Sequence, residues 1–353
     1  MKQFEITIAG SGKTFTVNEG ESILSAALRQ GVMLPYSCKN GTCGSCKGLV
    51  EEGMVHYPVH PAQALEEGDH EDNAALLCQA EPLTDLVIRA REIEAVRDIQ
   101  VRMLPARVME KEFLSKHVVR LVLRLPKTQR LQFLAGQYVD VLLSGGKRRA
   151  FSIASCPSLE NEIELHVRHI EGGGFTGYVF EELKERDIMR FEGPLGTFFV
   201  RNDRPERPMI MMGGGTGFAP IKSMVENLLE HENRREIDLY WGARNADELY
   251  LDDLPVRWAS EYEHIRYHRA LSDHDVNADP GFEAYYGFVH DAVAKNHPDL
   301  SGYDVYMSGP PAMIEAAKQA FLGLGLPEDR LFYDSFEFGL DVPIQALSKN
   351  PRI

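Results

Sequence analysis

The sequence lacks any apolar run of about 18 residues, the length needed to cross a bilayer. Its start, from Met1 to Thr7, alternates polar and apolar residues and has no apolar core of a signal peptide. Basic residues are scarce as well, because 38 Lys and Arg face 53 Asp and Glu, for a formal net charge of −15. The lack of a long apolar run argues against a membrane partner, and the scarcity of basic residues argues against a nucleic-acid partner. We therefore expect a cytoplasmic protein.

The chain shows three stretches of different pattern, with expected bounds 1–96, 97–204 and 205–353. The first mixes short strands with a helix beginning near Ser22. The second reads as short strands separated by Pro, Gly and Asn turns, which is typical of an antiparallel barrel. In the third, strands and helices alternate, which indicates a parallel doubly wound sheet. The predicted fold class is α+β multidomain, and the elements expected in the second stretch are strands at Val118–Leu125, Tyr138–Leu143, Phe151–Ala154 and Glu162–Val167 and a helix at Gly177–Leu183.

Four of the five cysteines follow the spacing of a plant-type [2Fe–2S] site. Three lie in one loop as C-x4-C-x2-C, and the fourth follows after 31 further residues. The alternatives are a tetrahedral zinc site or unrelated buried thiols, although zinc ribbons usually pair two short CxxC knuckles. Cys156 stands apart, and we expect it to be a small buried side chain. The predicted metal ligands are Cys38, Cys43, Cys46 and Cys78.

Two features of the second stretch suit a flavin. In the first, Arg149 can pair with a phosphate, Phe151 can stack on the isoalloxazine and Ser152 can hydrogen-bond near N5. Taken alone, this short motif also fits a basic turn followed by an edge strand. In the second, a glycine run opens a helix and offers N–H groups to a diphosphate, which favours FAD over FMN. The predicted flavin-binding residues are Arg149, Phe151, Ser152, Ile153, His166, Val167, Arg168, Gly173, Gly174, Phe175 and Thr176.

The third stretch carries a glycine-rich turn between a strand and a helix, with four glycines in residues 213–217. It is not the G-x-G-x-x-G fingerprint, but its glycines also let a pyrophosphate approach a helix N-terminus. Two more turns follow predicted strands, at the edge where open parallel sheets bind ligands. Arg244 in one of them either contacts the adenosine ribose or its phosphate or is a surface arginine. The predicted nucleotide-binding residues are Gly214, Gly215, Thr216, Gly217, Arg244, Ser308, Gly309, Pro310 and Met313.

The nucleotide preference rests on one observation. A single arginine and no nearby lysine follow the strand that ends at Ala243, which favours NADH over NADPH. Both NADH and NADPH therefore remain candidate electron donors.

With these residues, the chain resembles the ferredoxin–NADP reductase-like iron–sulfur flavoenzymes that carry an N-terminal ferredoxin domain. These include the reductase components of phenol hydroxylase and soluble methane monooxygenase, and CDP-6-deoxy-glucoseen reductase. The resemblance covers nearly the whole chain and is most specific in the segments Tyr36–Lys47, Gln137–Ala154, Glu192–Arg201, Gly213–Glu226 and Gly287–Ala292.

The resemblance implies a β-grasp ferredoxin domain, an FAD barrel and a pyridine-nucleotide domain, in that order. It implies that Arg149, Phe151 and Ser152 hold the isoalloxazine and that Thr176 with the preceding glycines holds the diphosphate. Many members have a cysteine before the Gly-Pro-Pro turn, where this chain has Ser308. A C-terminal aromatic near the flavin is a family feature, and the candidate is Phe336. The expected catalytic residues are thus Phe151, Ser152, Ser308 and Phe336.

The family implies an NAD(P)H oxidoreductase that passes electrons from NAD(P)H to FAD, then to [2Fe–2S] and to a partner protein. The expected partner is the hydroxylase component of a multicomponent oxygenase. The alternative is CDP-6-deoxy-glucoseen reductase acting with a partner dehydratase, and a third interpretation is a redox-sensing or scaffolding module. We expect a monomer in isolation. An acidic face either steers a basic partner or is merely solvated; it comprises Glu51, Glu52, Glu66, Glu67, Asp69, Glu71 and Asp72.

Overall fold

The protein is described here by a computed structural model, which covers residues 2–58, 64–65, 68–69, 72–96, 99–159, 161–273 and 282–336. The chain forms two compact units, residues 1–99 and 100–353. The expected boundary at 204/205 falls inside the second unit, and the one at 96/97 adjoins Arg97, outside the described residues. Both boundaries stay predictions. Among the described residues, no helix combines the length and apolar character needed to span a membrane.

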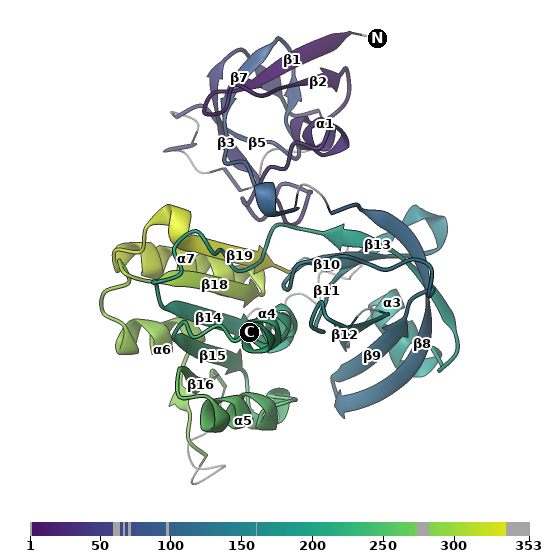
Figure 1. Cartoon of the computed structure of the whole chain (residues 1–353), viewed down its shortest axis with the longest axis vertical. Coiled ribbons are helices and arrows are strands. Elements are labelled where there is room, and N and C mark those ends of the chain that lie inside the picture. The colour runs from purple at the N-terminus through teal and green to yellow at the C-terminus, as the bar shows by residue number, and fades with distance from the viewer. Residues whose placement is uncertain are drawn as a thin grey trace. The chain divides into compact units, whose positions relative to one another are not determined.

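The first unit is built on a five-stranded sheet in the order β2-β1-β7-β3-β5 (Figure 1). Its elements are β1 (Gln3–Ile8), β2 (Thr14–Asn18), α1 (Ile23–Arg29), β3 (Lys47–Glu52), β5 (Ala74–Leu76), β7 (Leu86–Arg89) and the 3-10 turn η1 (Glu94–Val96). A small second sheet pairs β4 (Val55–His56) with β6 (Glu81–Pro82).

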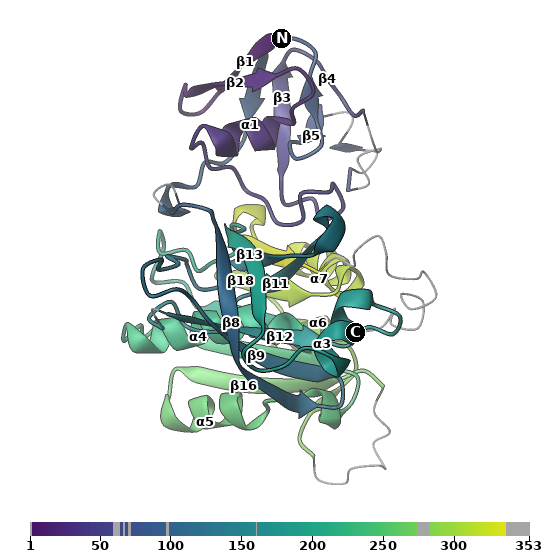
Figure 2. The ribbon, with the colours of Figure 1, turned by 90° about the vertical axis from the view of Figure 1, so that its right-hand side faces the viewer.

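The core of the first unit follows from the alternation of apolar residues. In β1, Phe4, Ile6 and Ile8 are buried and the residues between them face outward. Helix α1 lies across the sheet (Figure 2) and begins at the N-cap Ser22, whose hydroxyl accepts from the backbone N–H of Ser25. Cys46 and Cys78 belong to the same apolar core. The metal-ligand candidates are thus anchored in the packed part of the unit.

The second unit begins with a six-stranded antiparallel sheet in the order β11-β10-β13-β8-β9-β12. An isolated antiparallel bridge between Ile153 and Leu165 joins the two outer strands, so the sheet closes on itself. This confirms the predicted antiparallel barrel. The elements are β8 (Arg102–Ser115), β9 (Val118–Arg124), β10 (Tyr138–Leu142), the 3-10 turn η2 (Ser144–Gly146), β11 (Arg148–Ser152), β12 (Glu162–Arg168), α3 (Gly174–Glu181) and β13 (Ile188–Leu195).

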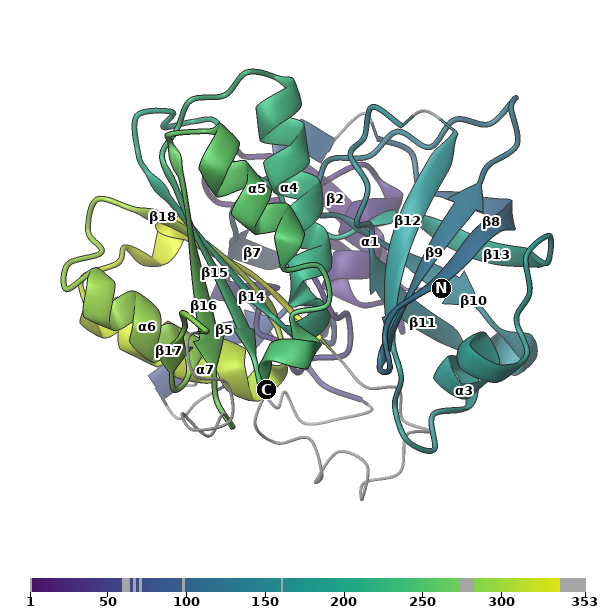
Figure 3. The same ribbon diagram turned by 90° about the horizontal axis from the view of Figure 1, so that it is seen from below.

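The rest of the second unit is a six-stranded parallel sheet in the order β17-β16-β15-β14-β18-β19, as predicted. Helices α4 and α5 cover one face, and α6 and α7 cover the other (Figure 3). The elements are β14 (Met209–Gly214), η3 (Gly215–Gly217), α4 (Phe218–Glu230), β15 (Ile237–Ala243), η4 (Ala246–Glu248), α5 (Asp253–Glu261), β16 (Ile265–Leu271), β17 (Tyr285–Tyr286), α6 (Val289–Asn296), β18 (Asp304–Gly309), α7 (Pro311–Gly323), η5 (Glu328–Arg330) and β19 (Leu331–Ser335).

Helix α4 also packs against the barrel. Its buried Lys222 donates to the carbonyl oxygen of Ala154 (3.2 Å), and the Ser223 hydroxyl donates to that of Ser155 (2.6 Å). Lys222 further pairs with Glu164 on β12 at 3.4 Å. Buried polar groups of this kind are costly unless they are paired. The pairing therefore fixes the glycine-rich turn that precedes α4 relative to the barrel strands β11 and β12.

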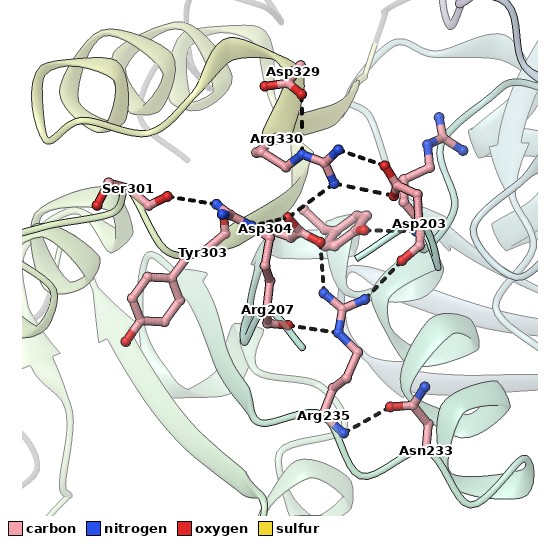
Figure 4. Close-up of polar contacts among 11 residues, drawn as sticks. Asp203, Arg207, Asn233, Arg235, Ser301, Tyr303, Asp304, Asp329 and Arg330 are labelled. Atoms are coloured by element: carbon pink, nitrogen blue, oxygen red, sulfur yellow. Dashed lines mark hydrogen bonds and ion pairs between the residues drawn. The ribbon is translucent and has the colours of Figure 1, made fainter. Parts of the chain in front are cut away.

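At the N-terminal end of β18, Asp304 is fully buried among three guanidinium groups (Figure 4). Its carboxylate accepts from Arg207 Nε (2.9 Å) and Arg235 Nη2 (2.8 Å), and Arg330 lies 3.7 Å away. Arg330 also pairs with Asp203 at 2.6 Å. Charges buried in this way hold a fixed geometry because each needs its partners. The cluster ties the segment that leaves the barrel to the edge of the parallel sheet opposite the glycine-rich turn.

Candidate functional site

The four cysteines expected to bind iron come together in the first unit. The Cys38 thiol is hydrogen-bonded to the thiols of Cys43 and Cys78, and Cys46 is bonded to Cys78. The hydrogen bonds from Cys43 and Cys78 hold the pKa of Cys38 far below its ordinary value, while those with Cys38, together with burial, raise the pKa of Cys43 and Cys78. Four thiols that lie this close together match the ligand set of an iron–sulfur cluster.

The loop around these thiols depends on glycine at a specific place. Gly41 has φ +87°, and a Cβ on it would lie 2.9 Å from Cγ of Gln79. The Gln79 amide in turn donates to the carbonyl oxygen of Lys39 (2.8 Å), which closes the loop against the segment carrying Cys78. The glycine is needed for both conformation and space. The loop thus forms a cradle that fits a small inorganic group.

Within the described residues, no three His, Cys, Asp or Glu side chains surround a point where one metal ion would sit. A mononuclear tetrahedral site would require such a point. A two-iron cluster shares its four thiolates between two metal ions, so convergence on one point is not required.

In the barrel, the two predicted flavin motifs lie side by side. The rings of Phe151, on β11, and Phe175, on α3, have centroids 5.5 Å apart. A Cβ on Gly173 would lie 2.7 Å from the Thr176 hydroxyl, which donates to the Gly173 carbonyl at 3.2 Å. Within the described residues no side chain caps the start of helix α3 at Gly174, in keeping with a diphosphate site. Arg149 leaves the same strand as Phe151 and is half-buried.

Other members of the predicted flavin set have side chains that face elsewhere. Ile153 and Val167 are fully buried in the barrel core. His166 is also buried, and its ring contacts Glu164 (2.7 Å) and the Tyr250 hydroxyl (3.0 Å). Burial lowers the pKa of His166, so the neutral ring donates to Glu164 and accepts from Tyr250. Since these side chains face away, a contact with FAD would come from their backbone atoms, and it stays a prediction.

The glycine-rich turn of the third stretch packs directly against the turn after β18. A Cβ on Gly217 would lie only 2.0 Å from the carbonyl oxygen of Ser308, and one on Gly214 would lie 2.5 Å from Sδ of Met313. Pro310 is the N-cap of α7, and Gly309 has φ +156°. Close approach of two backbones explains the glycines better than turn formation alone. The glycine-rich turn and the turn after β18 thus form one surface at the carboxyl edge of the sheet. Gly215 and Thr216, which lie in η3, belong to the glycine-rich turn.

Ser308 is the member of this surface with an unexplained polar atom. Its hydroxyl is buried, and no group in the described residues bonds to it. Ser308 is paired in register with Asp334 on β19, and the Ser152 hydroxyl of the barrel donates to Asp334 Oδ2 at 3.4 Å. The backbone N–H of Phe336 donates to the Gly309 carbonyl at 2.8 Å. Candidate residues from three distant segments therefore meet at one place.

Asp334 itself was not predicted from the sequence. It lies 182 positions from Ser152 and has no motif of its own. The only available signal was its place at the end of a predicted strand, two residues before Phe336. Asp334 is buried and accepts a hydrogen bond from the Ser152 hydroxyl, which makes it a further candidate for the site.

The second predicted turn is built around another residue that the sequence reasoning missed. Glu248, which is buried, accepts from Arg244 Nε (2.8 Å) and pairs with Arg168 of the barrel at 3.4 Å. The hydrogen bond with Glu248 raises the pKa of Arg244, and the charge of Asp273, whose backbone N–H donates to the Arg244 carbonyl at 2.9 Å, raises it further. Two of the three predicted cofactor-binding arginines, Arg168 and Arg244, therefore share the acidic partner Glu248.

Comparison with known families assigns a domain to each stretch. Residues 6–83 match the 2Fe-2S iron-sulfur cluster binding domain, residues 105–200 the oxidoreductase FAD-binding domain and residues 211–319 the oxidoreductase NAD-binding domain. The fold and these domains define an NAD(P)H oxidoreductase that carries FAD and a [2Fe–2S] cluster.

Individual relatives cover almost the whole chain. The CDP-6-deoxy-L-threo-D-glycero-4-hexulose-3-dehydrase reductase of Yersinia pestis is 39% identical over 92% of this chain and 96% of its own. The reductase component of phenol 2-monooxygenase from Pseudomonas sp. (strain CF600) is 39% identical over 96% of both chains. A solved cytochrome P450 reductase of Amycolatopsis is 34% identical, with a TM-score of 0.76 over 94% of this chain and 98% of that chain. The chain belongs to this family of iron–sulfur flavoprotein reductases, and the predicted family, fold class, cofactors and enzyme class are confirmed.

Proposed function

We propose that this chain takes electrons from NADH and delivers them one at a time to a separate oxygenase component. When bound, FAD accepts a hydride and the cluster passes on single electrons, which is why one chain carries both groups. The observation that carries the proposal is the meeting of Ser152, Ser308 and Asp334 between the barrel and the carboxyl edge of the parallel sheet, in a chain that also gathers four thiols. A flavin site and a nicotinamide site belong at such a junction.

Within that site, each side chain has a specific role. The Ser152 hydroxyl donates a hydrogen bond to Asp334, so its oxygen could accept one from the N5–H that flavin carries when it is reduced. Ser308 has a buried hydroxyl for the nicotinamide carboxamide. Phe151 and Phe336 would hold the isoalloxazine and exclude water from it. Arg149, together with the N-terminus of α3, holds the phosphates.

The exit of electrons through the cluster is tested by Cys43→Ser. We expect the variant to lose cytochrome c reduction, which needs the cluster, and to keep NADH-dependent ferricyanide reduction, which the flavin alone supports. The control is Cys156→Ser, whose thiol lies in the other unit beside Glu230 (2.9 Å) and should leave both activities and the cluster spectrum intact. Cytochrome c reduction at the wild-type rate in Cys43→Ser would refute the assignment of Cys43 as a ligand.

The partner is proposed from the relatives. Reductase components of phenol 2-monooxygenase and of terephthalate 1,2-dioxygenase from Comamonas sp. both align over 94% or more of this chain. The second candidate, a hexulose dehydrase reductase, rests on the equally similar Yersinia relative. Adding a purified oxygenase component from the same genome, or a dehydrase instead, decides between them. Product formation coupled to NADH oxidation with the dehydrase alone would overturn the oxygenase proposal.

The preference for NADH is proposed from the acidic partners of Arg244. A 2′-phosphate needs an uncompensated cation, whereas Arg244 is already bonded to Glu248 and lies near Asp273. We expect kcat/KM to be at least about tenfold higher with NADH than with NADPH, equivalent to roughly 1.4 kcal/mol. Equal values for the two nucleotides would contradict this.

The acidic face is less charged than the sequence suggests. Glu51 pairs with Arg89, and Asp69 pairs with Lys47 at 2.8 Å. Exposed pairs of this kind are worth little in stability but reduce the net charge presented to a partner. We propose that the chain acts as a cytoplasmic monomer and that steering of a basic partner is weak; light scattering and the salt dependence of cytochrome c reduction test these points. Glu66, Glu67 and Glu71 lie outside the described residues.

A further inference from the structure

The indole of Trp241 contacts the glycine-rich turn, although the sequence analysis gave this residue no role. Trp241 is on β15, paired in register with Gly213 on β14, and its side chain is fully buried. Its indole N–H donates to the carbonyl oxygen of Gly215 at 3.0 Å. A buried indole N–H needs an acceptor, so this bond fixes the ring and the carbonyl relative to each other.

Aromatic packing holds the indole in that position. Its ring stacks on Phe218, the first residue of α4, with centroids 3.8 Å apart and an interplanar angle of 11°. Tyr250 packs against the indole in a T-shaped arrangement, with centroids 5.1 Å apart. The Gly215 carbonyl also accepts from the backbone N–H of Phe218. Two donors, one from the indole and one from the start of α4, therefore hold this carbonyl against buried residues.

The orientation of the Gly215 carbonyl sets the direction of the next amide. In a planar trans peptide, the C=O of one residue and the N–H of the following residue point in opposite directions. Because the Gly215 carbonyl points at the buried indole, the N–H of Thr216 points away from it. Within the fully described segment from Met209 to Val225, Thr216 alone is not buried. The bond from the indole therefore directs a backbone donor away from the core at the accessible point of the turn.

We propose that Trp241 is a positioning residue for the nicotinamide nucleotide, because its bond to the Gly215 carbonyl aims the Thr216 N–H at the pyrophosphate. A backbone N–H just before a helix suits a phosphate oxygen, and α4 begins two residues later. The inference rests on the proposed role of the glycine-rich turn in nucleotide binding, which Gly217→Ala tests separately. An effect of Gly217→Ala alone removes only the role of Trp241, whereas no effect of either replacement removes the turn from the site.

The test is anaerobic stopped-flow reduction of the flavin by NADH in the full-length holoprotein, which gives the apparent Kd for NADH and the limiting rate separately. Replacing Trp241 with benzothienylalanine keeps the shape of the ring and puts sulfur in place of the N–H, so only the donor is lost. A hydrogen bond to a charged group changes an equilibrium constant by about tenfold or more. We therefore expect the apparent Kd to rise about tenfold. The limiting rate should stay within about twofold, because the bond acts on the phosphates and not on the reacting atoms.

The matched control is the same replacement at Trp258, the only other tryptophan in the sequence. Trp258 is buried on α5 and packs on the same Phe218 ring, with centroids 6.2 Å apart, so its replacement should leave both kinetic constants unchanged. A purely structural role for Trp241 predicts equal effects at the two positions, or a lower Tm with an unchanged Kd. Either result would overturn the proposal, as would a fall in the limiting rate without a rise in Kd.

Discussion

Replacing Gly217 with alanine should separate the two turns that we propose as the nicotinamide site. The new Cβ would lie 2.0 Å from the carbonyl oxygen of Ser308, 2.5 Å from its carbon and 3.0 Å from the Gly309 nitrogen. Protein Cβ contacts below 3.0 Å are essentially never seen, and both partners are backbone. The turns must therefore move apart by roughly 1 Å, because neither has a flexible side chain that can yield.

A displacement of about 1 Å at a reacting centre costs on the order of 10²-fold in rate. We expect Gly217→Ala to slow flavin reduction by NADH by about that factor and to raise the NADH concentration at half-saturation. The assay is anaerobic stopped-flow absorbance of the flavin after mixing with NADH, with flavin content measured for each preparation. The loss should appear at full flavin occupancy, because the barrel is not altered.

Two other glycines serve as matched controls. A Cβ on Gly302 would meet nothing within 4 Å, so Gly302→Ala should behave as the wild type. A Cβ on Gly214 would meet the Sδ and Cε atoms of Met313, the flexible end of a side chain, so Gly214→Ala should have an intermediate effect. If Gly217→Ala reduces its flavin within about twofold of the wild-type rate, the turns are not the nicotinamide site.

Two further predictions concern stability. Asp304→Ala leaves three guanidinium groups without their buried carboxylate, which should cost about 3–5 kcal/mol of unfolding free energy and lower the Tm of the second unit by roughly 10 °C. Replacing the exposed Asp329 with alanine is the control and should shift the Tm little. Equal Tm shifts of the two variants in calorimetry would contradict this. Burial favours the neutral form of Glu164, but the hydrogen bond from His166 and the charge of Lys222 lower its pKa to about 2. The resulting stability is present above about pH 4.5 and is lost as the pH falls towards 2. Between pH 5 and 3, denaturant titrations should therefore show the wild type losing up to about 2 kcal/mol more than Glu164→Gln, and parallel losses would refute the assignment.

Part of the architecture was readable from local sequence patterns. The barrel strands at Val118–Arg124 and Tyr138–Leu142 show clear apolar alternation and were predicted within a residue or two. The helix after the glycine run begins at Gly174, three residues before the predicted start at Gly177. Helix boundaries are weakly encoded because the first turn lacks internal hydrogen bonds.

The long strand β8 was missed for a physical reason. Pro105 lies inside it, and proline is normally excluded from the interior of a sheet because it has no N–H. Residues 102–107 pair with β13, while pairing with β9 begins only at Arg107. Pro105 therefore has a paired strand on one side alone, and a missing N–H on its unpaired side costs no ladder bond. Only the register of three strands reveals this.

The sequence by itself determined the chemistry that depends on closely spaced residues: the cysteine loop, the glycine-rich turns and hence the [2Fe–2S], FAD and nicotinamide assignments. Tertiary structure alone decided which side chains meet across long chain distances, such as Asp334 with Ser152 and Tyr57 with Leu76. Short motifs act through local backbone geometry, so they can be recognised from consecutive residues of the sequence. Residues that act by packing against another strand carry no local pattern, and only the folded sheets bring them together.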